Sequence, residues 1–128
     1  MDIQIFNAKK YNIDANEIKA KILKACHHQN FKGYIGIEFV DNNQIKKLNK
    51  KYRGINKVTD VLSFSTKTQN KNQVFGEIVI SPEYAKKYNI DAKEIIDLII
   101  HGIVHLLGYD HKKDENGWNK MLKKIEKG

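Results

Sequence analysis

The sequence predicts an α+β fold with a single mixed four-stranded sheet and about five helices. Four short runs rich in β-branched and aromatic residues predict the strands, and five segments with apolar residues at helical spacing predict the helices. The two kinds of segment do not alternate strictly, which favours α+β over a regular βαβ repeat. The length of 128 residues suits one domain spanning residues 1–128 and is too short for two ordinary domains.

The first half of the chain is expected to supply two strands and two helices. In order, these are a strand over residues 2–6, a helix over 16–30, a strand over 34–40 and a short basic helix from 42 to about 52. The first helix has Ile18 and Ile22 on one face, and the second follows Asp41, which has the position of an N-cap. Gly54 ends the second helix, because glycine readily adopts the left-handed conformation that follows many helices.

The second half is expected to begin with a strand pair and to end with three helices. In order, the segments are a strand over 61–65, a polar loop over 66–73, a strand over 75–80, a short helix from 82, a long helix over 92–107 and a last helix over 114–127. Ser81 and Pro82 mark a helix start, since the missing N–H of proline costs nothing in a first turn. The short link between the third and fourth strands favours an antiparallel hairpin. A helix lies at each connection among the first three strands, as parallel neighbours require.

Positive charge dominates the composition and is unevenly placed. The formal net charge is +8, 22 of the 23 basic residues are lysine, and Arg53 is the sole arginine. Arginine stands out here, because lysine would serve wherever only charge or solubility mattered. Between residues 42 and 59 six cations occur without an acidic residue: Lys46, Lys47, Lys50, Lys51, Arg53 and Lys57. Charge alone is compatible with a solvated helix face, and the sharper interpretation is a patch that contacts phosphates.

The sequence indicates a small cytosolic protein. No stretch approaches the ~20 uncharged residues of a membrane-spanning helix, and residues 1–6 do not resemble the start of a secretory signal. The single cysteine, Cys26, excludes an internal disulfide and fits a reducing compartment. We therefore expect no membrane association.

Three of the five histidines lie within eleven residues, at a spacing that suits a metal ion. His101 and His105 are four apart on the long helix, so both imidazoles can reach one point. Gly108 can end that helix and turn the chain back, which would return His111 toward the first two. Three neutral nitrogen donors leave the fourth tetrahedral position to water, and this predicts a catalytic zinc site rather than a closed structural one. Because residues 95–100 are apolar almost all round, we expect the histidine pair to be buried and to be stabilised by ligation.

The residues around the histidines disfavour a peptidase. The H-E-x-x-H pattern of metalloproteases places a glutamate after the first histidine as general base, and here that position is Gly102. Asp110 and Asp97 are candidates for orienting a ligand or handling protons. Asp97 lies one turn before His101 on the same face, which suits a partner of that imidazole. The alternative for Asp97 is a partly exposed polar residue without such a role.

Several motifs occur in order along the chain and together carry a family resemblance. They are Leu48-Asn49, Tyr52-Arg53-Gly54, Thr59-Asp60-Val61-Leu62-Ser63-Phe64, Gly76-Glu77-Ile78 and the block from His101 to His111. With these motifs the sequence resembles the YbeY family of bacterial rRNA maturation factors. The chain departs from the family pattern at Val58 and Ser65, where members usually have proline, and at Glu77, where aspartate is commoner.

The resemblance implies a zincin-like metallohydrolase domain, an α+β fold related to metalloprotease catalytic domains. It implies one zinc ion per chain, held by His101, His105 and His111, and Arg53 matches the arginine that family members need for activity. The implied activity is a single-strand-specific endoribonuclease that matures the 3′ end of small-subunit 16S rRNA and serves ribosome quality control. The implied partners are rRNA of the pre-ribosomal small subunit, ribosomal proteins and an assembly GTPase. We expect a monomer in the cytoplasm.

A mechanism follows from these residues as a hypothesis. Arg53 would hold the scissile phosphodiester through two hydrogen bonds while zinc polarises a non-bridging oxygen or supplies hydroxide. Asp110 is the second candidate catalytic residue, and the lysines would contact neighbouring RNA phosphates. Tyr52 or Phe64 could stack a base, although each type is more often a core residue. Two alternatives stay open: a zinc hydrolase of a non-RNA substrate, such as a peptide, and a non-catalytic ribosome-assembly factor whose metal stabilises the fold.

Overall fold

The computed structural model describes residues 2–26, 32–65, 73–107 and 114–127. Within these ranges it contains four strands and five α-helices, together with a short 3₁₀ helix, η1. The strands are β1 (Asp2–Phe6), β2 (Lys32–Phe39), β3 (Val61–Ser65) and β4 (Gln73–Ile80). The helices are η1 (Lys9–Tyr11), α1 (Ala15–Ala25), α2 (Asn42–Arg53), α3 (Pro82–Lys87), α4 (Ala92–Leu106) and α5 (Glu115–Lys127). The predicted fold class, one mixed four-stranded sheet with five helices, is confirmed.

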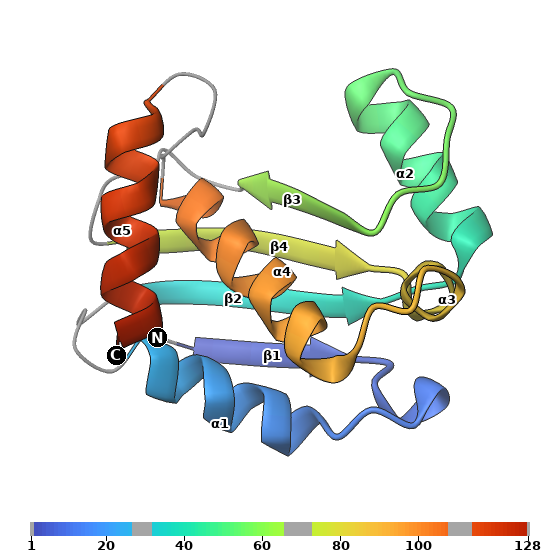
Figure 1. Cartoon of the computed structure of the whole chain (residues 1–128). Coiled ribbons are helices and arrows are strands. Elements are labelled where there is room, and N and C mark those ends of the chain that lie inside the picture. The colour runs from blue at the N-terminus through green and yellow to red at the C-terminus, as the bar shows by residue number, and fades with distance from the viewer. Residues whose placement is uncertain (1, 27–31, 66–72, 108–113, 128) are drawn as a thin grey trace.

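The strands form one sheet in the order β1-β2-β4-β3 (Figure 1). β1 and β4 both run parallel to β2, while β3 pairs antiparallel with β4, as the short link between them predicts. The strand order could not be read from the connections, because β4 lies between β2 and β3. The helix α2 therefore leads not to a neighbour of β2 but to β3, which is the edge strand on that side of the sheet. The polar segment 66–72 between β3 and β4 lies outside the described residues.

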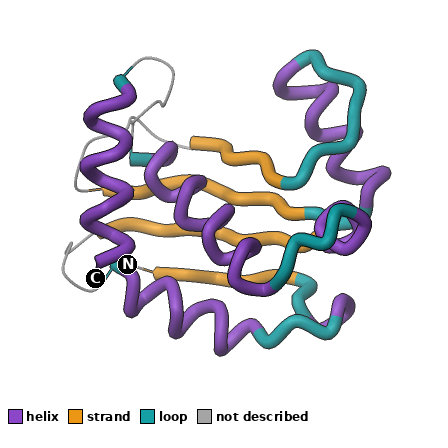
Figure 2. The backbone as a smooth tube through the Cα atoms, in the orientation of Figure 1, coloured by secondary structure: helices purple, strands orange, loops and turns teal. Residues whose placement is uncertain are grey.

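The two faces of the sheet are covered unequally (Figures 1 and 2). Alternate strand residues such as Ile35, Ile37 and Ile78 face the main core, which they form with apolar residues of α1, α4 and α5. On the opposite face a smaller cluster forms under α2, made by Val40, Ile45, Leu62 and Val79. Figure 1 shows α2 near the end of the sheet where β2 and β4 finish.

The ends of α1 and α2 follow from their local sequence. The Asp41 side chain accepts from the Gln44 backbone N–H at 2.8 Å, and the Gln44 side chain accepts from the Asp41 N–H, which completes a capping box. Gly54 ends α2 in the left-handed region with φ 70°. The prediction for α1 is wrong at its end: the helix stops at Ala25 rather than residue 30, because Cys26 leaves helical geometry with ψ 4°. Among the described helices, none is long and apolar enough to cross a membrane.

Candidate active site

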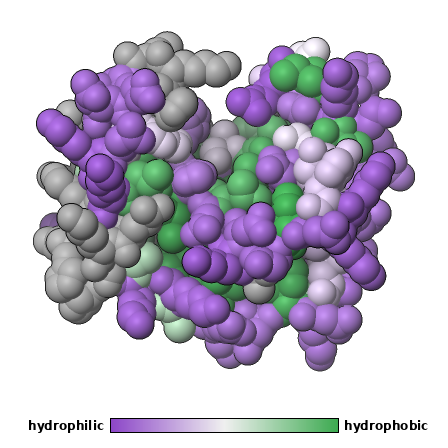
Figure 3. Space-filling view, viewed as in Figure 1, coloured by the Kyte–Doolittle hydropathy of each residue, from purple (hydrophilic) through white to green (hydrophobic). Residues whose placement is uncertain are grey.

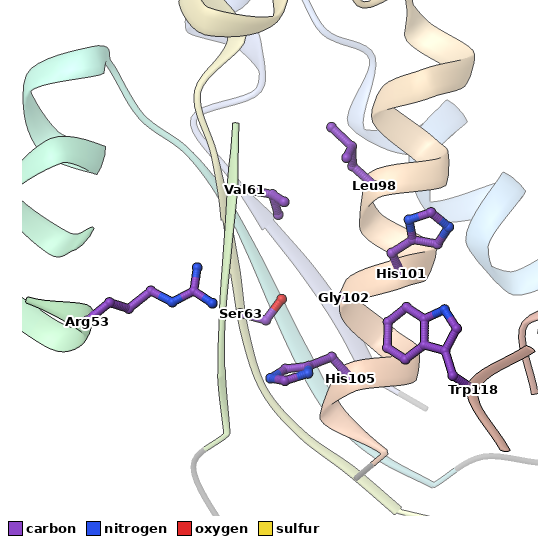
Figure 4. A pocket seen from close by; sticks show the side chains of 8 residues that line it. All are labelled: Arg53, Val61, Ser63, Leu98, His101, Gly102, His105 and Trp118. Carbon is purple, nitrogen blue, oxygen red and sulfur yellow. The ribbon is translucent and has the colours of Figure 1, made fainter. Parts of the chain in front are cut away.

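His101 and His105 lie one turn apart on α4, and Figure 4 shows the His105 ring directed toward β3 and the His101 ring directed toward Trp118. Both imidazoles line a single cavity of about 200 Å³. The prediction that they share a face is confirmed, but the prediction that they are buried is wrong, because both are exposed. The apolar residues of α4 point elsewhere: Ile99, Ile103 and Leu106 are fully buried against the sheet. The histidines therefore escape the desolvation cost of burial and can meet a ligand from solvent.

Gly102 brings α4 directly against the sheet beside the histidines. A Cβ at this position would lie 2.9 Å from both the Ile78 Cδ1 and the Ser63 Oγ atoms. A methyl group or the longer glutamate side chain would therefore require the ends of the Ile78 and Ser63 side chains to shift. The close packing of Gly102 against the sheet thus disfavours a glutamate at this position. It supports the sequence argument against a peptidase of the H-E-x-x-H kind.

Arg53 joins the histidine cavity from a distant part of the chain. It is the last residue of α2 and exposed, and with Ser63 of the edge strand and Trp118 of α5 it lines the same cavity as the histidines (Figure 4). Figure 3 shows this face hollowed between α5 and α2, with apolar residues in the recess. No acidic residue occurs among the described residues that line the cavity. Two imidazoles, a guanidinium and a hydroxyl suit an anionic group such as a phosphate.

Sequence reasoning missed four residues that line this cavity, the apolar Val61 and Leu98 and the hydrogen-bonding Ser63 and Trp118. Leu62 and Phe64 of β3 face the cluster under α2. Because side chains alternate along a strand, Ser63 between them faces α4. Trp118 places its ring centroid 6.0 Å from that of His101, with the planes tilted by 54°. Its signal in the sequence is weak: it is the single tryptophan, and it lies at helical spacing with other apolar residues.

The predicted RNA-binding lysines lie near Arg53 but outside the cavity. Lys46, Lys47, Lys50 and Lys51 are exposed along α2, and Lys57 is exposed in the following segment. Positions 46, 50 and 53 fall on one line along a helix, while 47 and 51 fall on another. The structure thus places Lys46 and Lys50 in line with Arg53. The contacts of all five with RNA stay a prediction.

Of the two acidic residues predicted to belong to the site, Asp97 lies in a neighbouring cavity, and Asp110 lies outside the residues that the structure describes. Half-buried Asp97 lines a cavity of about 280 Å³ on α4 together with His101, Asp60 and Glu94. This places Asp97 beside His101, as predicted, while its role stays a prediction. Asp110 lies outside the described residues, and so does the predicted third ligand, His111.

The donor set of the described residues is compatible with a metal ion but incomplete. His101 and His105 both line the cavity, and their spacing of four residues on a helix is one that zinc sites use for two of their ligands. Over residues 2–26, 32–65, 73–107 and 114–127, no group of three or more histidine, cysteine or acidic residues is close enough to hold an ion. The described residues therefore supply two of the three predicted ligands, and the third, His111, lies outside them.

Comparison with known proteins decides the family. A sequence model described as "Endoribonuclease YbeY" matches residues 4–127. The chain belongs to the YbeY family. The Persephonella marina protein named Endoribonuclease YbeY is 40% identical over 107 residues, which cover 77% of this chain and 70% of the relative. The relative of the same name from Clostridioides difficile is 42% identical over 93 residues, covering 64% of this chain and 61% of the relative. The matched part is under two thirds of that relative's length.

A solved structure extends the YbeY comparison to the fold. The solution structure of TM1509 from Thermotoga maritima superposes on this chain with a TM-score of 0.61 and 28% sequence identity. The superposition covers 96% of this chain and 88% of the other. The similarity therefore extends over nearly the whole fold of this chain.

Proposed function

We propose that this chain is a metal-dependent endoribonuclease that cleaves single-stranded RNA and acts in rRNA processing at the 3′ end of small-subunit rRNA. The observation that carries the proposal is the cavity in which Arg53 meets His101 and His105. The relatives named Endoribonuclease YbeY supply the substrate class. We further propose that the protein acts in the cytoplasm, where rRNA is processed. Its further partners would be ribosomal proteins and an assembly GTPase, and its active form would be a monomer.

The metal in this proposal is one zinc ion held by His101, His105 and His111. When bound, it would supply a Lewis acid to the phosphate and to water at neutral pH. Because His101 and His105 are exposed, a metal site that they form would be accessible to substrate from solvent. Gly102 keeps the side of α4 next to them free of a competing side chain.

Arg53 is proposed to bind and orient the scissile phosphate. Its guanidinium can donate two parallel hydrogen bonds to phosphate oxygens, which a lysine cannot match. Since Arg53 is the last residue of α2 and Gly54 ends that helix, the backbone beneath the side chain is fixed. A guanidinium held in advance beside the reacting group stabilises charge that develops during cleavage without reorganising first.

Lys46 and Lys50 are proposed to continue the phosphate contacts along α2, because they lie in line with Arg53. Contacts to phosphates carry no base information, so binding through them tolerates many sequences and weakens with salt. Lys57 lies three residues beyond Gly54 and would contact the RNA strand past the C-terminal end of the helix, the end that carries Arg53. Asp110 is kept as a second candidate catalytic residue that can accept or hold a proton.

The test compares substrates and variants under one set of conditions. Purified protein should cleave a single-stranded oligoribonucleotide, leave a matched duplex and casein intact, and lose about 10²-fold or more of its activity in Arg53→Lys and His105→Ala. Elemental analysis should find about one zinc per wild-type chain and clearly less in His105→Ala. Zinc-dependent cleavage of casein would favour a peptidase instead. An Arg53→Ala protein that still supports rRNA processing, while chelation melts the fold, would favour a non-catalytic assembly factor.

A further inference from the structure

A second cavity lies across the edge strand from the histidines. It measures about 350 Å³, within the roughly 300–1,000 Å³ of small-ligand pockets, and lies between α2 and the face of the sheet opposite α4. Consecutive residues separate the two cavities: Arg53 and Ser63 line the histidine cavity, whereas Tyr52 and Phe64 line this one. The split follows from the alternation of side chains along β3 and from the turn of α2. An RNA strand whose phosphate contacts Arg53 would therefore pass next to the second cavity.

One wall of the second cavity is aromatic. The ring centroids of Tyr52 and Phe64 lie 4.9 Å apart, with the planes tilted by 54°. Tyr52 is nevertheless 57% exposed, and the Lys51 Nζ atom lies 5.2 Å from the centre of its ring. An exposed ring beside a cation is the arrangement that proteins use to stack unpaired bases between phosphate contacts.

The sheet side of the cavity also carries two carboxylates. Glu77 is paired in register with Phe64 on the neighbouring strand, and Glu38 is paired with Val79, so both project from this face of the sheet. Carboxylates accept hydrogen bonds and donate none, so they match the exocyclic amino groups of cytosine, adenine and guanine and repel a phosphate. Uracil has no amino group, and its single N3–H donor lies between two carbonyl oxygens that the same negative charge would repel.

We propose that this cavity binds one unpaired nucleobase of the RNA strand whose phosphate contacts Arg53, and that it favours bases with an amino group over uracil. The inference rests on the proposed ribonuclease function. In single-stranded RNA each phosphate is followed by a base. The protein offers matching groups side by side, because Arg53 would bind a phosphate and the adjacent Tyr52 would stack on a base. Base selection next to the cleaved bond would then come from Glu38 and Glu77, while the lysines bind phosphates regardless of sequence.

The chain offers a matched control for the aromatic wall. Tyr88 is 56% exposed, its ring centroid lies 4.6 Å from that of Tyr84, and the Lys87 Nζ atom lies 5.7 Å from its centre. Tyr52→Ala should weaken binding of a single-stranded oligoribonucleotide roughly tenfold and raise KM by the same factor. Tyr88→Ala should leave both unchanged. Because both rings are exposed, the Tm of each variant should stay within a few degrees of wild type.

Base identity is tested with oligoribonucleotides that differ at one position. Replacing a cytosine by uracil or by an abasic site next to the cleaved bond should reduce wild-type kcat/KM about tenfold. The difference between cytosine and uracil should shrink in Glu77→Gln and Glu38→Gln, because a glutamine amide can both donate and accept.

The outcomes separate this inference from the proposed function. If Tyr52→Ala behaves like Tyr88→Ala, or if no base at any position matters, the base pocket is overturned while Arg53-dependent RNA cleavage stands. If the wild type neither binds nor cleaves RNA, both proposals fail. A lysine-rich peptide that binds wild type but not Glu77→Gln, with RNA binding unaffected by Tyr52→Ala, would overturn the base pocket in favour of a basic protein partner.

Discussion

The side-chain amide of Asn49 donates a hydrogen bond to the backbone carbonyl of Lys57, at 3.0 Å. Asn49 is only 3% exposed, and its own backbone carbonyl accepts from the N–H groups of Gly54 and Ile55. A single residue inside α2 thus holds the segment that follows Arg53. Arg53 therefore lies between two backbone positions that Asn49 holds, its own helix and the segment up to Lys57.

Asn49→Leu is expected to reduce both stability and activity. Loss of the amide removes the hydrogen bond to the Lys57 carbonyl, whose net contribution to the unfolding free energy is about 0.5–1.5 kcal/mol, measured in urea titrations. The kcat/KM for RNA should fall as well, because Arg53 is less well placed. In an Arg53→Ala background the same change should have little further effect on kcat/KM, a coupling that a double-mutant cycle measures. Asn43→Leu, exposed on the same helix, is the control; equal effects from both would contradict the positioning role.

Gly76→Ala is expected to destabilise the sheet strongly. A Cβ there would overlap the backbone oxygen of Phe64 and lie 2.6 Å from the Leu106 Cδ2 atom, so β3 or α4 would have to move. We expect a loss of about 2–3 kcal/mol in chemical denaturation. Gly54→Ala is a suitable comparison, because nothing lies within 4 Å of a Cβ there and only the positive φ of 70° is unfavourable. Its cost should be about 1 kcal/mol; a larger loss at Gly54 than at Gly76 would contradict the packing.

The two lysines in line with Arg53 should dominate the salt dependence of RNA binding. Each phosphate contact contributes about 0.7 to the slope of log K against log salt for a single strand, so Lys46→Ala/Lys50→Ala should lower the slope by about 1.4. The double variant Lys86→Ala/Lys87→Ala removes the same charge from exposed positions on α3. It should change the slope far less. Equal slopes for the two double variants would show that the contacts are not localised on α2.

Features that depend on local chemistry could be predicted from the sequence. The spacing of His101 and His105 gives a shared helix face, the Asp41 cap and Gly54 give the limits of α2, and a short link gives the β3–β4 hairpin. Each is a property of a few adjacent residues. They needed no knowledge of how the elements pack.

Features that depend on packing could not be predicted. The insertion of β4 between β2 and β3 places the segment with Ser63 at the edge of the sheet, and no pattern inside either strand encodes that order. Apolar composition suggested that His101 and His105 are buried, but composition does not say which side of a helix meets the core. Arg53 and Trp118 are 65 residues apart in the sequence, and only the folded chain brings them to one cavity.

Cys26 should make the stability of the protein fall at alkaline pH. Burial raises the pKa of the Cys26 thiol from 9.0 to about 11, because the thiolate is poorly solvated in the core. The unfolded chain therefore loses its thiol proton first as the pH rises above about 9, and the folded state holds the proton longer. Stability from this group is complete below pH 9 and is lost between about pH 9 and 11, amounting to about 2 kcal/mol at the upper end. The measurement is the difference in unfolding free energy between wild type and Cys26→Ala across this range, because the difference isolates the thiol. If that difference does not change with pH, the thiol is not buried as the structure describes.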